Sequence, residues 1–470
     1  MYPMENSHTD KPEDATPAVA PTEDAPDSGL PEAAGAQSDA RAVPHTRLSR
    51  FSRMVRIATG VAGGMIAEGS RQLAKGNRPR TSDLLLTPAN ARRVADQLAQ
   101  LRGAAMKVGQ LVSMDAGDLL PKELTDILAR LRSDAHAMPA KQLEAQLCEN
   151  WGEDWQRRVY SFSSRPVAAA SIGQVHEAIS LRGKRLAIKI QYPGVRRSID
   201  SDVDNVASLL RISRLLPSRI DIKPLLQEAK RQLHEEADYL AEAAHLVNFR
   251  QLLRDAPQFV VPEVDEELTT ESILAMSFVE GHPIESLEGS ARRTRDRAVS
   301  LLMELFFREL FEFQLVQTDP NFANYRYCYQ SKRLVLLDFG ATRAYSREFA
   351  RSYRKLFRAV VNADRDLAFE AGRAIGYFQD HVTAEQAELL LDIIMMAGEP
   401  FQCDGPYDFG ASHLGTRLNE AAMVLSRDKD YWHTPPADAL FLHRKLGGLF
   451  LLAARLEARA DVRELVAPHL

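Results

Sequence analysis

Residues 334–340 read Leu-Val-Leu-Leu-Asp-Phe-Gly, and this stretch decides the fold class. Four consecutive apolar residues predict a short buried strand. The strand ends at Asp338, which is followed by an aromatic residue and a glycine, an arrangement that can hold a metal ion against phosphate groups. A tripeptide of this kind also occurs by chance in ordinary turns, so its meaning depends on the motifs that precede it.

The composition is that of an ordinary globular protein and excludes several functional classes. Of the 470 residues, 45% are hydrophobic and 26% are charged, and the net charge is -5. A protein that neutralises many phosphates carries a basic excess, so we expect no nucleic-acid partner. The three cysteines, Cys148, Cys328 and Cys403, lack metal-ligand spacing and are interpreted as reduced thiols. No stretch reaches the roughly 20 apolar residues of a transmembrane helix.

Two segments of opposite charge precede the expected folded region. Residues 1–45 are rich in Pro, Ala, Asp and Glu. We expect a disordered acidic tail, because this segment cannot bury enough apolar area to offset the entropy of ordering. Residues 46–85 instead carry many basic residues around an apolar, glycine-rich run. This pattern suits an anionic membrane surface, and it fits a flexible basic linker ending in a core helix equally well.

The first motif lies on an expected helix. Residues 86–160 show helical periodicity, and Lys-Val-Gly-Gln occupies positions 107–110 within them. Lys107 and Gln110 are three residues apart and share one helix face. In isolation, the motif describes an ordinary amphipathic helix with a solvated lysine.

Strand patterns follow over residues 162–190. A run of small residues at 168–173 precedes Leu-Ala-Ile-Lys-Ile at 186–190. The alternation places Lys189 on the opposite face from three large aliphatic side chains. A kinase presents in this way the lysine that grips the α- and β-phosphates of ATP.

A helix is expected over residues 223–249, and it carries three acidic residues. Asp238 and Glu242 are four residues apart and share a face, whereas Glu236 lies nearly on the opposite side from Asp238. If Glu242 turns inward to pair with Lys189, Glu236 must find another partner. Taken alone, these three acidic residues would be explained by a charged, solvent-exposed helix surface.

The next segments provide a hinge and a catalytic loop. Residues 259–280 are expected to form a hairpin, and Glu280-Gly281 follows as a hinge whose backbone would face an adenine. A core helix is expected over 296–315. Asp319 and Asn324 then have the Asp-x-x-x-x-Asn spacing of a kinase catalytic loop.

The remaining sequence completes the pattern. Asp338 follows Asn324 by fourteen positions, which leaves room for a hairpin with strands at 325–329 and 333–337. Helical patterns continue from there, and residues 441–452 are interpreted as a closing core helix.

Taken in order, these motifs resemble those of the UbiB (AarF-domain) family of atypical protein-kinase-like proteins. The residues around Asp319 and Asp338 resemble those of the branch that supports coenzyme Q biosynthesis. The resemblance covers about 90–470. It implies an α+β, two-lobed protein-kinase-like fold with an N-terminal helical extension packed over the active site. We therefore expect this extension at 86–160, an N-lobe at 161–281 and a helical C-lobe at 282–470.

The resemblance also implies roles for individual residues. Lys189, fixed by Glu242, would grip the phosphates of ATP or ADP, and Asp319 would orient the attacking hydroxyl or water and accept its proton. Asn324 and Asp338 would hold Mg²⁺. Further nucleotide contacts are expected from the small-residue loop and the hinge: Ala168, Ala169, Ala170, Ser171, Gly173 and Glu280. An occluding, regulatory set consists of Lys107, Gln110, Glu236 and Asp238.

Two departures from ordinary kinases restrict the expected activity. Alanines replace the glycine-rich loop, and alanine is stiffer than glycine by roughly 0.5–1 kcal/mol per residue. Gln317-Thr318 replaces the His-Arg of the catalytic loop, and no Ala-Pro-Glu follows Asp338. A platform for peptide substrates is therefore not expected. In the family, the Lys-x-Gly-Gln helix covers the site, which suggests a contact of Lys107 with Glu236 or Asp238.

The leading hypothesis is a membrane-associated, Mg-dependent ATPase or small-molecule kinase that supports ubiquinone synthesis. Its expected partners are a nucleotide, an anionic membrane surface, lipid-like quinone intermediates and ubiquinone-biosynthesis proteins. A nucleotide-binding scaffold and a protein kinase are the alternatives. The acidic tail has neither a signal-peptide nor a transit-peptide pattern. A cytoplasmic location of bacterial type, peripheral to the inner membrane, is therefore expected.

Overall fold

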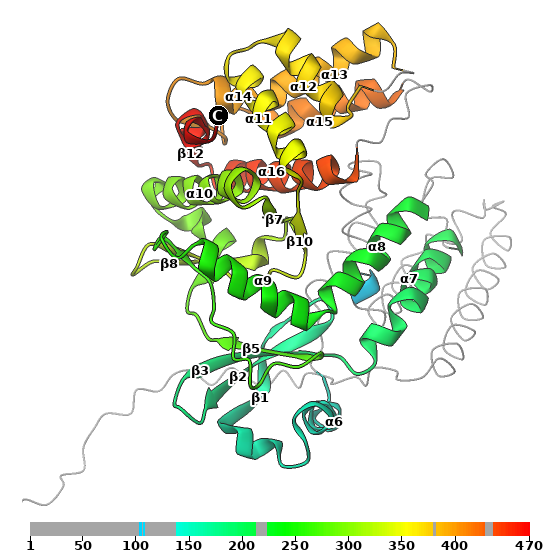
Figure 1. Cartoon of the computed structure of the whole chain (residues 1–470), viewed down its shortest axis with the longest axis vertical. Helices are drawn as coiled ribbons and strands as arrows, with labels where there is room; N and C mark the ends of the chain where they lie inside the picture. The colour runs from blue at the N-terminus through cyan, green and yellow to red at the C-terminus, as the bar shows by residue number, and fades with distance from the viewer. Residues whose placement is uncertain (1–102, 106, 109–137, 213–222, 379–381, 428–435) are drawn as a thin grey trace, which may run out of the picture. The chain divides into compact units, whose positions relative to one another are not determined.

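The computed structural model describes residues 103–105, 107–108, 138–212, 223–378, 382–427 and 436–470 (Figure 1). The expected acidic tail at 1–45, the basic segment at 46–85 and Gln110 lie outside the described residues. Within the described part, strands dominate up to about residue 192 and helices dominate from residue 292 onward.

The first sheet positions Lys189. It is antiparallel with strand order β1-β2-β3-β5, formed by β1 (Val159–Ala169), β2 (Gly173–Ser180), β3 (Arg185–Gln191) and β5 (Ile273–Ser277). The helix α6 (Ala140–Trp151) shares a buried apolar cluster with Ile188 and Ile190 of β3. Because side chains alternate along a strand, Lys189 lies on the face away from this cluster, as predicted.

The acidic helix region differs from the expectation. The helix α7 (Val195–Ile212) is followed by α8 (Lys223–Glu236) and α9 (Tyr239–Leu252), so the single helix expected over 223–249 is wrong. Asp238 is the N-cap of α9, and its carboxylate accepts a hydrogen bond from the backbone N–H of Ala241 at 3.1 Å. A short carboxylate satisfies a free donor at a helix start better than it serves in a helix interior. Asp238 and Glu242 therefore do not form a pair along one helix face.

The second sheet positions Asp338. Its strand order is β4-β9-β8-β6, formed by β4 (Phe259–Val260), β6 (His282–Pro283), β8 (Tyr325–Cys328) and β9 (Arg333–Leu336). The predicted β8–β9 hairpin is confirmed. The hairpin expected over 259–280 forms only in part: Val264 bridges Met276 in antiparallel fashion, but β4 runs parallel to β9 and β5 joins β3 in the first sheet. The first four residues of β5 are all buried, so other parts of the protein pack against both faces of this strand.

The rest of the described chain is mostly helical. The expected core helix over 296–315 is α10 (Arg292–Phe307), followed by the π-helix η5 (Arg308–Phe313) and the strand β7 (Leu315–Gln317), which pairs with β10 (Thr342–Ala344). The remaining elements are α11 (Arg347–Val361), α12 (Arg365–Ile375), α13 (Ala384–Ala397), α14 (Glu399–Gln402), β11 (Tyr407–Asp408), α15 (Leu414–Arg427), α16 (Ala437–Arg455), β12 (Arg459–Ala460) and α17 (Val462–Val466).

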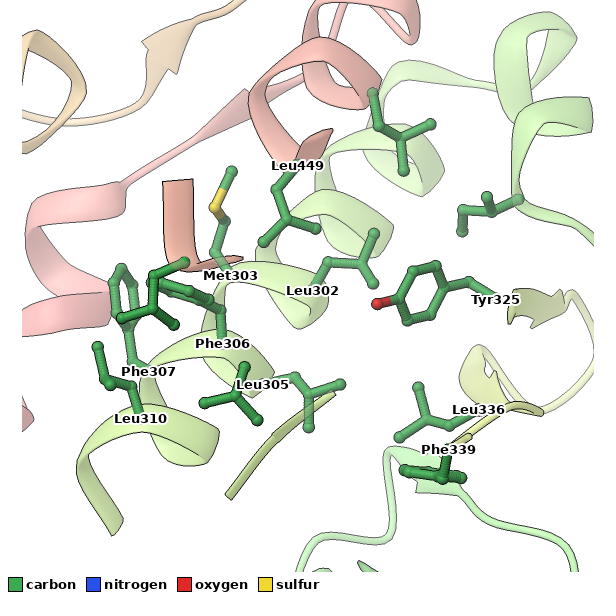
Figure 2. Close-up of a cluster of buried hydrophobic side chains, with 14 of the residues drawn as sticks. Leu302, Met303, Leu305, Phe306, Phe307, Leu310, Tyr325, Leu336, Phe339 and Leu449 are labelled. Carbon is green, nitrogen blue, oxygen red and sulfur yellow. The ribbon is translucent and has the colours of Figure 1, made fainter. Parts of the chain in front are cut away.

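A continuous apolar core joins these helices to the second sheet. Figure 2 shows the side chains of α10 together with Leu449 of α16, Leu336 at the end of β9, and Phe339. The predicted core helix at 441–452 is therefore present within α16. Among the described residues, no helix is both long and apolar enough to cross a membrane.

Candidate nucleotide site

Lys189 is the centre of a buried charge cluster. Its ammonium donates hydrogen bonds to both carboxylate oxygens of Glu242 at 2.9 Å and to Asp338 at 3.1 Å. Burial opposes the charged form of Lys189, but Asp338 and Glu242 outweigh it and raise the pKa of this lysine. Burial also raises the pKa of Glu242 to about 7. Lys189 is therefore an ammonium near neutral pH, and its charge favours the carboxylate form of Glu242 against the effect of burial.

Asp338 is held in place from both ends. One carboxylate oxygen accepts from Lys189 and the other accepts from the backbone N–H of Gly340 at 3.0 Å. Burial alone would raise the pKa of Asp338, but Lys189 and the Gly340 N–H lower it below its usual value. Phe339 is buried and packs against Phe249 of α9, with ring centroids 4.5 Å apart. The aromatic residue thus anchors the end of the strand, and the carboxylate next to it stays ionised.

Backbone hydrogen bonds join the predicted catalytic loop to the residues on either side of Asp338. The Thr318 backbone N–H donates to the Ala341 carbonyl at 2.8 Å, and the Leu337 N–H donates to the Asn324 carbonyl at 3.0 Å. The side-chain amide of Asn324 donates to Asp319 at 3.0 Å. Burial raises the pKa of Asp319, although the charge of Lys107 opposes this shift. The loop and the strand end therefore form one rigid unit.

The donor set fits Mg²⁺. The Asn324 amide nitrogen is directed at Asp319, which leaves the amide oxygen to face a cation, and Asp338 supplies carboxylate oxygens. Hard oxygen ligands suit Mg²⁺, which usually takes only one or two protein groups and completes its shell with phosphates and water. No cluster of three or more His, Cys, Asp or Glu side chains suited to a metal occurs within the described ranges.

Lys107 reaches this cluster from the helical extension. Lys107 is 4% exposed, and its ammonium donates a hydrogen bond to Glu236. The hydroxyl of Ser171 donates to the other oxygen of Glu236 at 2.5 Å. The structure thus places Lys107 against Glu236, while Asp238 caps α9 instead. The negative charges of Glu236 and Asp319 help to keep Lys107 protonated by raising its pKa despite burial.

The small-residue loop is shorter than expected. Ala168 and Ala169 belong to β1 and pair with Val175 and Gln174. The turn is closed by a hydrogen bond from the Ala170 N–H to the Gly173 carbonyl at 2.9 Å. A Cβ on Gly173 would lie 2.2 Å from the Ile190 carbonyl oxygen, so this glycine is needed for close contact between strands.

The hinge residue Glu280 is not part of the charge cluster. Its exposed side chain pairs with Arg185 of β3 at 2.7 Å, so only its backbone remains available to an adenine. Tyr239, which was not predicted as a site residue, is fully buried, and Lys189 lies over its ring at 5.1 Å. Within the described part of the chain, its hydroxyl has no hydrogen-bond partner. Its place directly after Asp238, one of the acidic residues singled out in the sequence, was the available signal.

Comparison with known proteins gives a consistent result. Residues 130–371 match the ABC1 atypical kinase-like domain. The chain is 39% identical to the mitochondrial atypical kinase COQ8B of Rattus norvegicus, over 91% of this chain and 81% of that protein. It is 37% identical to the mitochondrial atypical kinase COQ8 of Saccharomyces cerevisiae, over 90% and 84% respectively. Among solved structures, the Rv3197–erythromycin complex from Mycobacterium tuberculosis matches with a TM-score of 0.57 and 25% identity, covering 79% of this chain and 93% of that one.

Proposed function

We propose that this chain, which belongs to the ABC1 atypical kinase-like family, binds ATP with Mg²⁺ and cleaves the terminal phosphate in support of ubiquinone biosynthesis. The acceptor is either water or a small, lipid-like quinone intermediate. The observation that carries the proposal is the three-way contact of Lys189 with Glu242 and Asp338. A structural ion pair would need one carboxylate, whereas a phosphate-gripping lysine needs one carboxylate to hold it and a second beside the metal.

The residues divide the work of phosphoryl transfer. Lys189, held by Glu242, neutralises charge on the α- and β-phosphates. Mg²⁺ held by Asp338 and Asn324 would supply Lewis-acid neutralisation of the phosphate oxygens. Asp319 orients the attacking hydroxyl or water and takes its proton. The raised pKa of Asp319 suits a base, because basicity increases as the pKa rises toward the working pH.

The position of Lys107 argues against protein substrates. Its ammonium pairs with Glu236 beside the Asp319 and Asp338 carboxylates, where a peptide hydroxyl would have to enter. We therefore assign the site to water or a small acceptor. The basic segment at 46–85 is proposed to bring the protein to an anionic bilayer, where such an acceptor would be found.

The test is Mg-dependent phosphate release by the purified protein, with and without liposomes rich in anionic lipid. Turnover that is lost in Asp338→Asn and increased by liposomes supports the proposal. Turnover equal to that of Asp338→Asn, with nucleotide still bound, would replace it with a nucleotide-binding scaffold. Labelled phosphate transferred to another protein would replace it with a protein kinase.

A further inference from the structure

A buried lysine lies beneath the catalytic loop. Lys445 of α16 is 2% exposed, and its ammonium donates hydrogen bonds to the Gln317 carbonyl at 2.7 Å, the Gln317 side-chain oxygen at 3.0 Å and the Tyr325 hydroxyl at 2.9 Å. It also forms an ion pair with Glu309 at 3.2 Å. Replacing a buried ion pair with apolar residues of similar volume is often neutral or stabilising. Stability alone therefore does not explain this arrangement.

The contacts of Lys445 bracket the reactive residues. Gln317 precedes Asp319 by two positions, and Tyr325 directly follows Asn324. One ammonium group thus holds the chain on both sides of the segment that carries these two residues. Figure 2 shows Tyr325 in the same core as Leu449 of α16.

A second contact from the same helix face supports the loop. Gly448 is one turn beyond Lys445, so the two share a face of α16. A Cβ on Gly448 would lie 3.0 Å from the Cβ of Pro320, the residue after Asp319. The absence of a side chain at Gly448 therefore allows α16 to pack closely against the loop.

Glu309 fixes the lysine from the other side. It is 1% exposed and lies in the π-helix η5, immediately before the strand that leads into the loop. Its carboxylate also accepts a hydrogen bond from the Gln317 backbone N–H. Both backbone groups of Gln317 are thus held by one ion pair. A π-helical turn is rare and occurs frequently at functional sites.

We propose that Lys445, held by Glu309, is a positioning residue that fixes the distance between Asp319 and Asn324. Lys445 acts on the reaction through Gln317 and Tyr325. This inference rests on the proposed phosphoryl-transfer function for its kinetic consequence, but not for its effect on metal binding.

The test uses the full chain with the double substitution Lys445→Met/Glu309→Gln, which removes both charges at nearly constant volume. His443→Phe is the matched control, because His443 lies on the same helix but instead bonds Tyr377 at 2.5 Å. Four quantities are measured: the Tm, the kcat for ATP, the affinity for metal-free ADP, and the affinity for Mn²⁺ in the presence of ADP by electron paramagnetic resonance.

We expect the double variant to remain folded and to lose kcat by roughly 10- to 100-fold, since a misplacement of about 1 Å can cost this much. Mn²⁺ affinity falls several-fold, whereas metal-free ADP affinity is unchanged. The control variant has the native kcat and the native Mn²⁺ affinity, whether or not its Tm changes. In an Asp319→Asn background, the double substitution lowers kcat by a smaller factor than it does in the native protein.

A double variant with native kcat and native Mn²⁺ affinity overturns the inference, as does a control that loses both to the same extent. If the native protein has no turnover, the proposed function fails, and the Mn²⁺ measurement alone decides the role of Lys445. If the double variant does not fold, Tyr325→Phe removes one contact of Lys445 and carries the same test. A weaker Mn²⁺ site then supports the inference, and an unchanged one contradicts it.

Discussion

The substitution Glu242→Gln tests the centre of the proposed site. Glu242 accepts two of the three hydrogen bonds that Lys189 donates, and it is 1% exposed. Glutamine keeps the shape of the side chain but removes its charge. The ammonium of Lys189 then has only the Asp338 carboxylate, so it shifts toward Asp338 and competes with the metal for the same oxygens.

The magnitude follows from the contacts that are lost. Removing one preorganised electrostatic contact to a transition state costs about 3–4 kcal/mol, or a factor of roughly 10²–10³ in rate. The cost in stability is smaller, about 1–2 kcal/mol, because Asp338 still compensates the buried ammonium. We expect kcat/KM for MgATP to fall by two to three orders of magnitude in a protein that stays folded.

The assay measures phosphate release at limiting and saturating MgATP, together with urea unfolding of the same samples. The control is Glu370→Gln, which removes an exposed ion pair to Lys355 at 2.7 Å. A surface pair of this kind contributes at most about 1 kcal/mol. A folded Glu242→Gln variant with kcat/KM within tenfold of the native value would refute the assignment of Lys189 as a phosphate-gripping residue.

Three further predictions concern other parts of the chain. Asp338→Asn should abolish Mg-dependent turnover, and titration with Mn²⁺ should show a weakened metal site; an unchanged site would contradict the ligand assignment. Gly448→Ala should lower turnover through contact with the catalytic loop while the Tm holds or rises, because alanine favours a helix by about 1 kcal/mol over glycine; a lower Tm with native turnover would contradict this. Burial lowers the pKa of His443 to about 4 from 6.5. The unfolded chain therefore binds the proton first, and this group lowers the free energy of unfolding as the pH falls from 6.5 toward 4. The free energy of unfolding, measured with urea, should therefore fall less steeply with decreasing pH in His443→Phe than in the native protein. Equal slopes would show that the pKa of His443 is the same in the folded and the unfolded chain.

Local patterns predicted the parts of the site that lie on strands. The apolar run before Asp338 became β9, and the alternation around Lys189 placed the lysine on the correct face. Both results follow from a period of two and from a core that covers one side, so a short window of sequence contains the information.

The errors arose where distant segments or a helix end decided the structure. The break between α8 and α9 depends on Asp238 as an N-cap, and an aspartate in a continuous helical pattern was the available signal. The parallel pairing of β4 with β9 joins segments far apart in the chain, which no local pattern encodes. Lys445 was passed over because its helix is mostly apolar, although a single lysine in such a helix implies a buried partner.

The support of the catalytic loop by α16 has a consequence for biosynthesis. Lys445 follows Gln317 by 128 residues, so a ribosome completes the loop long before it makes the helix beneath it. At about 5–20 residues per second, the interval is roughly 6 to 26 s. During that time both ends of the loop lack their ammonium contact. On the proposed function, competence for phosphoryl transfer would therefore arise only after α16 has been made, and a nascent chain would not consume ATP before that point.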